Sequence, residues 1–277
     1  MNEDVDRHYR QDGLTARIQH ELARCGYDLS ELRPGDLAGV DEFHLGGRAA
    51  TDALLGGLGL SRESRILDVG CGIGGAARTV ASTIGCSVTG VDLTNDFVET
   101  ATDLSVAVGM DDTTTFTPGD ALDLPFGDGE FDAVLMLHVG MNISDKVALM
   151  AELARVLRSG GTLVVYDIMR VGEGEMAFPV PWASGPSTSF LAAPLDYRDA
   201  MFAAGLEPGT AVDRLDLVRS ALKAASRNPP PVNLSHLMGE GWPTMFANLV
   251  AALDAGVVSP TEIVARRPSE PSPEAPT

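Results

Sequence analysis

One segment, ILDVGCGIGG at residues 66–75, restricts the possible folds of this chain more than any other. Its apolar start is typical of a buried strand that ends near Asp68, and a helical pattern begins directly after the glycines. Gly70, Gly72 and Gly74 would let the backbone approach a ligand closely and leave N–H groups available at a helix N-terminus. The segment therefore predicts a ligand-binding turn between a strand and a helix.

The order of strand, turn and helix repeats along the chain from about residue 47. Short apolar runs predict strands over residues 65–69, 87–93, 113–116, 132–137 and 162–168. Helical spacing predicts helices over 75–84, 95–108 and 145–158. In the last of these, Val147, Met150, Ala154 and Leu157 form one apolar face and Gly160-Gly161 supplies the stop. Such alternation predicts an α/β fold, with a mostly parallel central sheet covered by helices on both faces.

The two ends of the chain differ from this core. Apolar residues at helical spacing before Pro34 predict that residues 1–45 form an N-terminal helical cap, too short to bury a core alone. Residues 46–267 are expected to form the main domain, with irregular insertions near 169–194 and 227–243 and a disordered tail at 268–277. Further helices are expected near 195–204, 218–226 and 243–254, and further strands at 210–217 and 261–266.

The charge of the chain limits its partners. It has 39 acidic against 20 basic side chains, a formal charge of -19, so it repels phosphate backbones and anionic lipid surfaces. We therefore expect neither nucleic acid nor a membrane as a partner. MNEDVDRHYR, the start of the chain, lacks the features of a secretory signal, and three cysteines without a CxxC pair fit a reducing compartment, so we expect a cytoplasmic protein. The oligomeric state stays open, with a homodimer as one candidate.

Three acids indicate which ligand the glycine turn would hold. Asp68 lies inside the turn, where its carboxylate would attract a cationic or amino-bearing ligand and repel a pyrophosphate. Asp92 ends the next strand, where it can accept hydrogen bonds from both hydroxyls of a ribose. Asp120, in GDALDLPF, follows the third strand, where it can accept from the exocyclic amine of adenine.

Together these motifs resemble those of the class I S-adenosylmethionine (SAM)-dependent methyltransferases. LDVGCGIG resembles the first motif of that family, GVDL its ribose-binding acid, GDALDLPF its adenine-side motif and ELARVLRSGGTLVVYDI its fifth-strand region. The resemblance covers about residues 43–168 and implies a Rossmann-like fold that binds SAM and releases S-adenosylhomocysteine. The cofactor-binding residues that it implies are His44, Gly46, Asp68, Gly70, Cys71, Gly72, Gly74, Asp92, Leu93, Asp120, Ala121 and Leu137.

Three further pieces resemble a small-molecule branch of this family, the sarcosine/dimethylglycine-type or ubiquinone-biosynthesis-type methyltransferases. They are DEFHLGG at 41–47, HVGMNISDK at 138–146 and FPVPWA at 178–183. This resemblance favours N- or O-methylation and leaves C-methylation open. In the first piece, His44 and Gly46 either contact the methionine end of SAM or form only a tight turn.

His138 follows the fourth strand, at the edge of a parallel sheet where ligands bind. Its imidazole is a candidate catalytic base, and the alternatives are a contact with the carboxylate of SAM or a structural role. Asn142 could orient a substrate or cap the next helix, for which Ser144 is the better candidate. Met141 could contact cofactor or substrate, or belong to the core.

Side chains in the two insertions could form the wall of an acceptor pocket. The candidates are Phe178, Trp182, His236 and Trp242, with both tryptophans expected in loops. The alternative is a separate hydrophobic cluster beneath a long loop. The histidines lack HxxxH or HxH spacing, so no metal site is predicted.

Three functions compete at this point. The first is a SAM-dependent methyltransferase acting on a small molecule. The second is a nicotinamide-dependent oxidoreductase, against which Asp68 inside the turn argues. The third is a SAM-binding fold that serves a non-methylating reaction or acts as a binding subunit.

Overall fold

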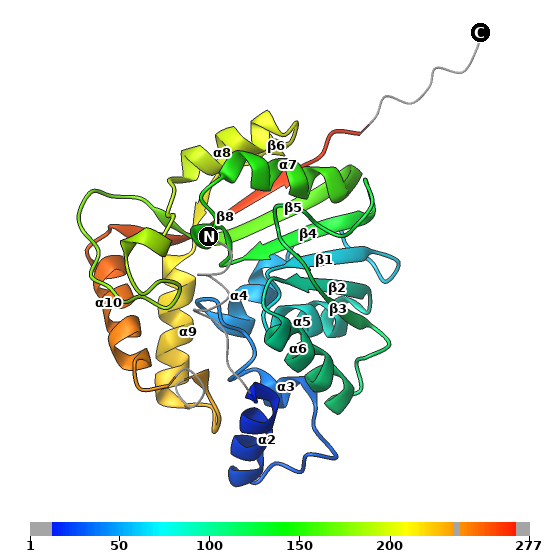
Figure 1. The fold of residues 1–277 in the computed structure, drawn as a ribbon, viewed down its shortest axis with the longest axis vertical. Coiled ribbons are helices and arrows are strands. Elements are labelled where there is room, and N and C mark those ends of the chain that lie inside the picture. The colour runs from blue at the N-terminus through cyan, green and yellow to red at the C-terminus, as the bar shows by residue number, and fades with distance from the viewer. Residues whose placement is uncertain (1–12, 235–238, 270–277) are drawn as a thin grey trace.

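The computed structural model describes residues 13–234 and 239–269, built around one sheet in the order β3-β2-β1-β4-β5-β8-β6 (Figure 1). The parallel strands are β1 (Arg65–Val69), β2 (Ser87–Asp92), β3 (Thr114–Pro118), β4 (Phe131–Leu137) and β5 (Leu157–Arg170). β8 (Val258–Arg266) runs antiparallel to β5 and pairs with the short strands β6 (Glu207–Pro208) and β7 (Val212–Asp213). The predicted mostly parallel sheet is confirmed.

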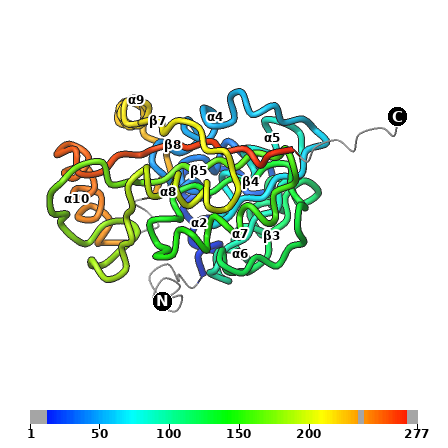
Figure 2. The backbone as a smooth tube through the Cα atoms, turned by 90° about the horizontal axis from the view of Figure 1, so that it is seen from above, coloured from blue at the N-terminus to red at the C-terminus, as the bar shows by residue number. Residues whose placement is uncertain are grey.

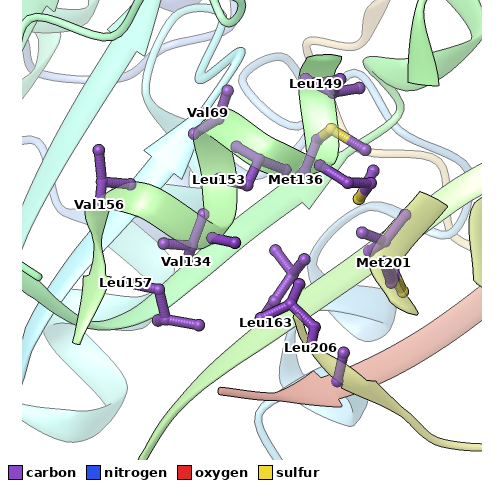
Figure 3. Packing of buried hydrophobic residues seen from close by; sticks show 14 of the residues in the cluster. Val69, Val134, Met136, Leu149, Leu153, Val156, Leu157, Leu163, Met201 and Leu206 are labelled. Atoms are coloured by element: carbon purple, nitrogen blue, oxygen red, sulfur yellow. The ribbon is translucent and has the colours of Figure 1, made fainter. Parts of the chain in front are cut away.

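Helices cover both faces of this sheet because successive side chains of each strand point to opposite sides. Leu67 of β1 belongs to a cluster with α7 (Lys146–Val156) and α8 (Pro194–Ala203). Its neighbour Ile66 belongs to a cluster with α4 (Gly47–Leu54) and α5 (Gly75–Ile84). Figure 3 shows side chains of the first cluster, contributed by β4, β5, α7 and the end of α8. The strands are therefore buried on both sides, as predicted.

The junction of α7 and β5 corrects the sequence analysis. α7 ends at Val156, and Gly160-Gly161 lies within β5, so these glycines do not stop the helix. They are instead held in the sheet region by backbone bonds with Arg267, whose N–H donates to the carbonyl of Gly161 at 2.9 Å. The cap of α7 is Asp145 rather than Ser144, since its carboxylate accepts from the N–H of Ala148. Val147, expected on the apolar face, is 58% exposed.

The N-terminal part packs against the main sheet layers. α2 (Leu14–Arg24) buries Leu14, Ile18 and Leu22, which confirms the predicted amphipathic helix. These side chains form one cluster with residues of α6 (Asn95–Ala107), and the hydroxyl of Thr15 donates to that of Thr100. The short helix α3 (Pro34–Leu37) follows, with Pro34 at its first position. The cap thus shares its apolar contacts with the domain that it covers.

Two helices between β7 and β8 lie beyond the carboxyl ends of the parallel strands (Figures 1 and 2). They are α9 (Leu215–Arg227) and α10 (Trp242–Asp254). The predicted strand over 210–217 is wrong beyond residues 212–213, because the carboxylate of Asp213 accepts from the N–H of Leu215 and α9 begins there. Trp242 opens α10 and is not in a loop, contrary to expectation. None of the described helices has the length and apolar character needed to cross a membrane.

Candidate active site

A cavity of about 670 Å³ opens at the carboxyl ends of β1, β2 and β4. Sixteen of the predicted site residues line it: His44, Gly46, Asp68, Gly70, Cys71, Gly72, Asp92, Leu93, Asp120, Ala121, Leu137, His138, Met141, Asn142, Trp182 and Trp242. Gly74 lies behind the wall as the N-cap of α5, and Phe178 packs in the apolar cluster around Trp182. His236 lies outside the described residues. Most of the predicted site residues therefore line one cavity.

The glycine turn is fastened to β2. The N–H of Gly70 donates to the carbonyl of Val91 at 2.8 Å, and the N–H of Gly72 donates to the carboxylate of Asp92 at 2.8 Å. Gly70 has a φ of 71°, and a Cβ there would clash with the side chain of Val139. Glycine is needed at this position for both reasons. The glycine turn therefore lines the cavity with backbone atoms and not with side chains, as the sequence predicts.

Asp68 is the most unusual acid of the site. Only 1% of the residue is exposed, and its carboxylate accepts from the N–H of Ala77 in the first turn of α5. Its Oδ2 atom is buried with no hydrogen-bond partner among the described residues. Burial, with the nearby charges of Asp92 and Glu42, raises the pKa of Asp68 to about 7. A buried acceptor of this kind, on the wall of a cavity, suits a ligand that brings a donor and a positive charge.

The two other acids are placed by backbone donors. The carboxylate of Asp92 accepts from the N–H of Thr94 at one oxygen and from that of Gly72 at the other. Asp120 accepts from the N–H of Leu122 at 3.0 Å. These backbone contacts orient both side chains on the wall of the cavity.

His138 has the only positive φ among the described non-glycine residues, at 58°. Its N–H donates to the carbonyl of Tyr166 at 2.7 Å, and its ring centroid lies 5.1 Å from the ring of Tyr166. The Nε2 atom is buried without a hydrogen-bond partner in the described chain. Burial, with His44 nearby, lowers the pKa of His138 well below its usual value. The ring is therefore neutral near pH 7, and its Nε2 can accept a hydrogen bond when the ring proton is on Nδ1.

His44 is held by the protein itself. Its Nε2 lies 3.2 Å from the carbonyl of Gly47, which can only accept, so this nitrogen carries the proton. The same nitrogen is 3.1 Å from the hydroxyl of Thr51, which donates to Glu42. Burial lowers the pKa of His44 to about 4. His44 thus forms a neutral, fixed part of the wall, next to His138 at 6.0 Å between ring centroids.

Two residues that the sequence analysis did not single out hold this wall. Arg78 of α5 is 1% exposed and donates to the carboxylate of Asp41 at 2.9 Å and to the carbonyl of Ile73 at 2.7 Å. Asp41 is itself buried and lines the cavity. An arginine among the apolar residues of helix 75–84 was the available signal, because a buried charge requires a partner. The pair joins the N-terminal segment to the glycine-turn helix.

The segment after β4 is joined to the 169–194 insertion. The amide of Asn142 donates to the carbonyl of Trp182 at 2.9 Å, and the carbonyl of Met141 accepts from the N–H of Phe190 at 2.7 Å. The ammonium of Lys146 donates to the carbonyls of Gly140 and Phe190 at 2.8 and 2.7 Å. Asn142 therefore does not cap α7, and its amide positions the insertion.

Comparison with known proteins identifies the family. Residues 67–165 match the profile of the methyltransferase domain. The chain is 34% identical over 185 residues to 27-O-demethylrifamycin SV methyltransferase of Amycolatopsis mediterranei, covering 64% of this chain and 66% of that one. Residues 67–165 thus carry the methyltransferase domain typical of the class I SAM-dependent methyltransferases. The chain spans less than two thirds of the length of this relative, and 48% or less of several others.

Solved structures agree with the fold of this family. A geranyl diphosphate methyltransferase in complex with GPP and sinefungin has a TM-score of 0.70 and 22% identity, covering 96% of this chain and 98% of that one. The [4+2]-cyclase SpnF has a TM-score of 0.62 and 24% identity, covering 80% and 82%. The Rossmann-like methyltransferase fold is thus shared over most of the chain.

The residues of the cavity fit the SAM of this family. SAM carries positive charge on its sulfonium and amino groups, and Asp68 Oδ2 is a buried acceptor that no described residue satisfies. Gly70 and Gly72 keep side chains out of the space beside it. Asp92 and Asp120 are already oriented by backbone N–H groups on the same wall. This donor and acceptor set matches an amino-bearing, ribose-containing cation.

Proposed function

We propose that this protein is an enzyme that transfers a methyl group from SAM to a small-molecule acceptor and releases S-adenosylhomocysteine. The observation that carries the proposal is the pairing of two buried, unpartnered polar side-chain atoms on one cavity, Asp68 Oδ2 and His138 Nε2. The first suits the charged end of SAM. The second suits a hydroxyl or amine of the molecule that receives the methyl group, so N- or O-methylation is favoured and C-methylation stays open.

In this reaction the protein itself would bind the reactants, align them and exclude water from the site. SAM supplies an activated methyl group on its sulfonium, so displacement needs no further activation of the donor. Asp68 and the backbone at Gly70 would hold the methionine end, Asp92 the ribose, and Asp120 with Ala121 the adenine. His44 and Leu137 would enclose the reacting region and exclude water from it.

His138 is the residue that we assign to the acceptor's proton. A hydroxyl acceptor would donate to Nε2, and this nitrogen would take the proton as the oxygen gains the methyl group. The positive φ of His138 aims the ring from the end of β4 into the cavity wall, and a strained backbone at a cleft is consistent with a functional role. The lowered pKa keeps the ring neutral, as a proton acceptor must be.

The variant His138→Asn tests this assignment, because asparagine tolerates a positive φ better than other side chains. Isotope-labelled SAM, an acceptor panel of phenols, amines, thiols and carbon acids, and mass spectrometry would give turnover, and calorimetry would give SAM affinity. If His138 is the base, turnover falls about 10²- to 10⁴-fold with SAM affinity nearly unchanged. Equal losses in both would favour a cofactor contact instead.

A second function has one specific observation in its favour. SpnF, whose structure resembles this one, is a [4+2]-cyclase. A SAM fold can therefore accompany a reaction other than methylation, or serve as a binding subunit. If calorimetry shows SAM binding while no acceptor in the panel gains the label and a polyene acceptor cyclises, this second function is supported.

Further expectations from the sequence belong to the same proposal. We infer that the protein acts on a small molecule and without nucleic acid, because its formal charge of -19 repels phosphate backbones. We also propose a cytoplasmic location, since three cysteines without a CxxC pair fit a reducing compartment. A homodimer is the oligomeric state to test first, by sedimentation. The division into a cap at 1–45 and a domain at 46–267 is testable by whether a chain that lacks the cap still folds and binds SAM.

A further inference from the structure

The lining of the cavity divides by element into two chemically different walls. The strand ends, the glycine turn and the segment before α4 contribute all of the acids: Asp41, Glu42, Asp68, Asp92 and Asp120. The residues after β4, the insertion, α9, α10 and the described part of the loop between them contribute no charged side chain. We call this second set the apolar wall, and its largest members are Met141, Trp182, Leu222, Trp242, Phe246 and Leu249.

We propose that the apolar wall is the acceptor subsite and takes a predominantly apolar molecule without an anionic group, whose hydroxyl reaches His138. This inference rests on the proposed methyl transfer and specifies its substrate class. It departs from the sarcosine/dimethylglycine-type substrate that the sequence resemblance suggested, because such a zwitterion carries a carboxylate.

The apolar wall is a built surface held in place by specific bonds. Trp182 is 2% exposed, its indole N–H donates to the hydroxyl of Ser189 at 3.0 Å, and its carbonyl accepts from Asn142. The insertion is tied to α10 by Asn248, whose amide donates to the carbonyl of Pro179 at 2.9 Å. On α10, the rings of Trp242 and Phe246 stack at 5.6 Å. Pre-formed aromatic surfaces of this kind favour apolar and flat ligands without an ordering cost.

The cavity is poorly suited to an anionic acceptor. Arg48 is the single basic residue among its described lining besides the two histidines, which are held neutral, and its Nε lies 3.8 Å from the carboxylate of Asp52. A phosphate or carboxylate would lose its water without gaining an ion pair, and it would face the acids of the opposite wall. The net charge of the chain adds to this repulsion.

The polar group of the acceptor has one evident place. His138 Nε2 is a buried polar atom without a partner in the described residues, and it accepts a hydrogen bond when the ring proton is on Nδ1. Met141 and Asn142, which follow it by one turn, belong to the apolar wall. The amide of Asn142 is bonded to Trp182. A methyl-acceptor molecule with an apolar body and one hydroxyl could donate a hydrogen bond to His138 Nε2 while its apolar body covers the aromatic rings.

The test uses the full chain with S-adenosylhomocysteine bound and measures affinity by calorimetry for a series of 4-alkylphenols of increasing chain length. Burial of each methylene in an apolar site is expected to tighten binding about fourfold. The 4-alkylbenzoates and 4-alkylphenyl phosphates of equal length serve as anionic probes. We expect each anionic series to bind at least about tenfold more weakly than the phenols. A flat dependence on chain length, or equal or tighter binding of an anionic series, overturns the proposal.

Two variants locate the binding. Trp242→Leu and Phe246→Leu each replace one of the half-buried stacked rings with a smaller side chain. Each variant should bind 4-octylphenol about tenfold more weakly, with the affinity for S-adenosylhomocysteine unchanged. Phe202→Leu, on α8 and 76% exposed, is the matched control and should change neither. Unchanged phenol binding in both cavity variants, with the fold retained by circular dichroism, contradicts the subsite. Label transfer from SAM is measured separately, so phenol binding without transfer refutes the proposed activity and leaves this inference standing.

Discussion

Replacing Asp68 by asparagine should make the cofactor-free protein more stable and its cofactor affinity lower. The carboxyl is 1% exposed, and one oxygen has no hydrogen-bond partner in the described structure, so folding removes it from water without full compensation. Burial raises its pKa from an ordinary 3.8 to about 7. The folded protein therefore holds one more proton than the unfolded chain between these two pH values.

The sign and size of the effect follow from this difference. Stability is greatest below the pKa of the unfolded carboxyl and is lost as the pH rises through about 7, since ionisation is easier in the unfolded chain. At 1.36 kcal/mol for each tenfold change in the dissociation constant, the loss is on the order of 4 kcal/mol. Asparagine stays neutral, so Asp68→Asn should recover much of this free energy at pH 8, less the cost of burying an unpartnered amide.

Cofactor binding should respond in the opposite direction. The ionised carboxylate attracts the charged end of SAM, so the variant should lose roughly 1.5–3 kcal/mol of binding free energy, the usual value of a hydrogen bond to a charged group. Wild-type affinity should also increase between pH 6 and 8 as Asp68 ionises, and the variant should lose this dependence.

Urea denaturation and SAM calorimetry at pH 5, 6, 7 and 8 measure both effects. Asp103→Asn, which changes an exposed carboxylate of α6, is the matched control. A smaller fall in stability near pH 6 should persist in every variant, because burial raises the pKa of Asp167 to about 6. The reasoning is refuted if Asp68→Asn loses stability with pH as steeply as the wild type, or binds SAM equally well.

Three further outcomes are expected. Lys146→Met should lower the free energy of unfolding by about 3 kcal/mol in urea denaturation, because a buried ammonium bonded to backbone carbonyls is removed; a loss below about 1 kcal/mol would contradict that role. Asp92→Ala should weaken SAM binding by roughly 1–3 kcal/mol in calorimetry, and unchanged affinity would argue against the ribose contact. SAM binding near pH 7 should release a fraction of a proton from Asp68, detected as a dependence of the binding enthalpy on the buffer's ionisation heat, which should vanish at pH 9.

Local patterns predicted the elements whose structure is decided locally. α5 spans the predicted 75–84, and β1 spans the predicted 65–69, because an apolar run, a glycine turn and a helical repeat follow one another there. β5 was predicted too short, since its first residues are held in the sheet region by Phe131 and Arg267 and not by their own apolar character. Strand length depended on partners that no local window contains.

The candidate site shows the same limit. Three acids and a glycine turn could be located from their positions after strands, because parallel strands bring their carboxyl ends to one edge. Arg78 and Lys146 could not be identified in the same way, because a charged residue is usually exposed and only tertiary partners bury it. The unusual backbone of His138 was equally hidden, since no single residue type requires it.

The distribution of charge links stability to function in this protein. Asp68 and Glu42 are buried on the same wall, with Asp92 beside them, and each charge opposes the ionisation of Asp68. Without a ligand, protonation of Asp68 reduces the repulsion among these carboxylates. When a cation is bound, its charge offsets this repulsion and Asp68 can be ionised. A cation is therefore stabilised here more than a neutral analogue of the same shape. The same acids would repel an anionic acceptor, so the charge that selects the cofactor also restricts the substrates that can approach it.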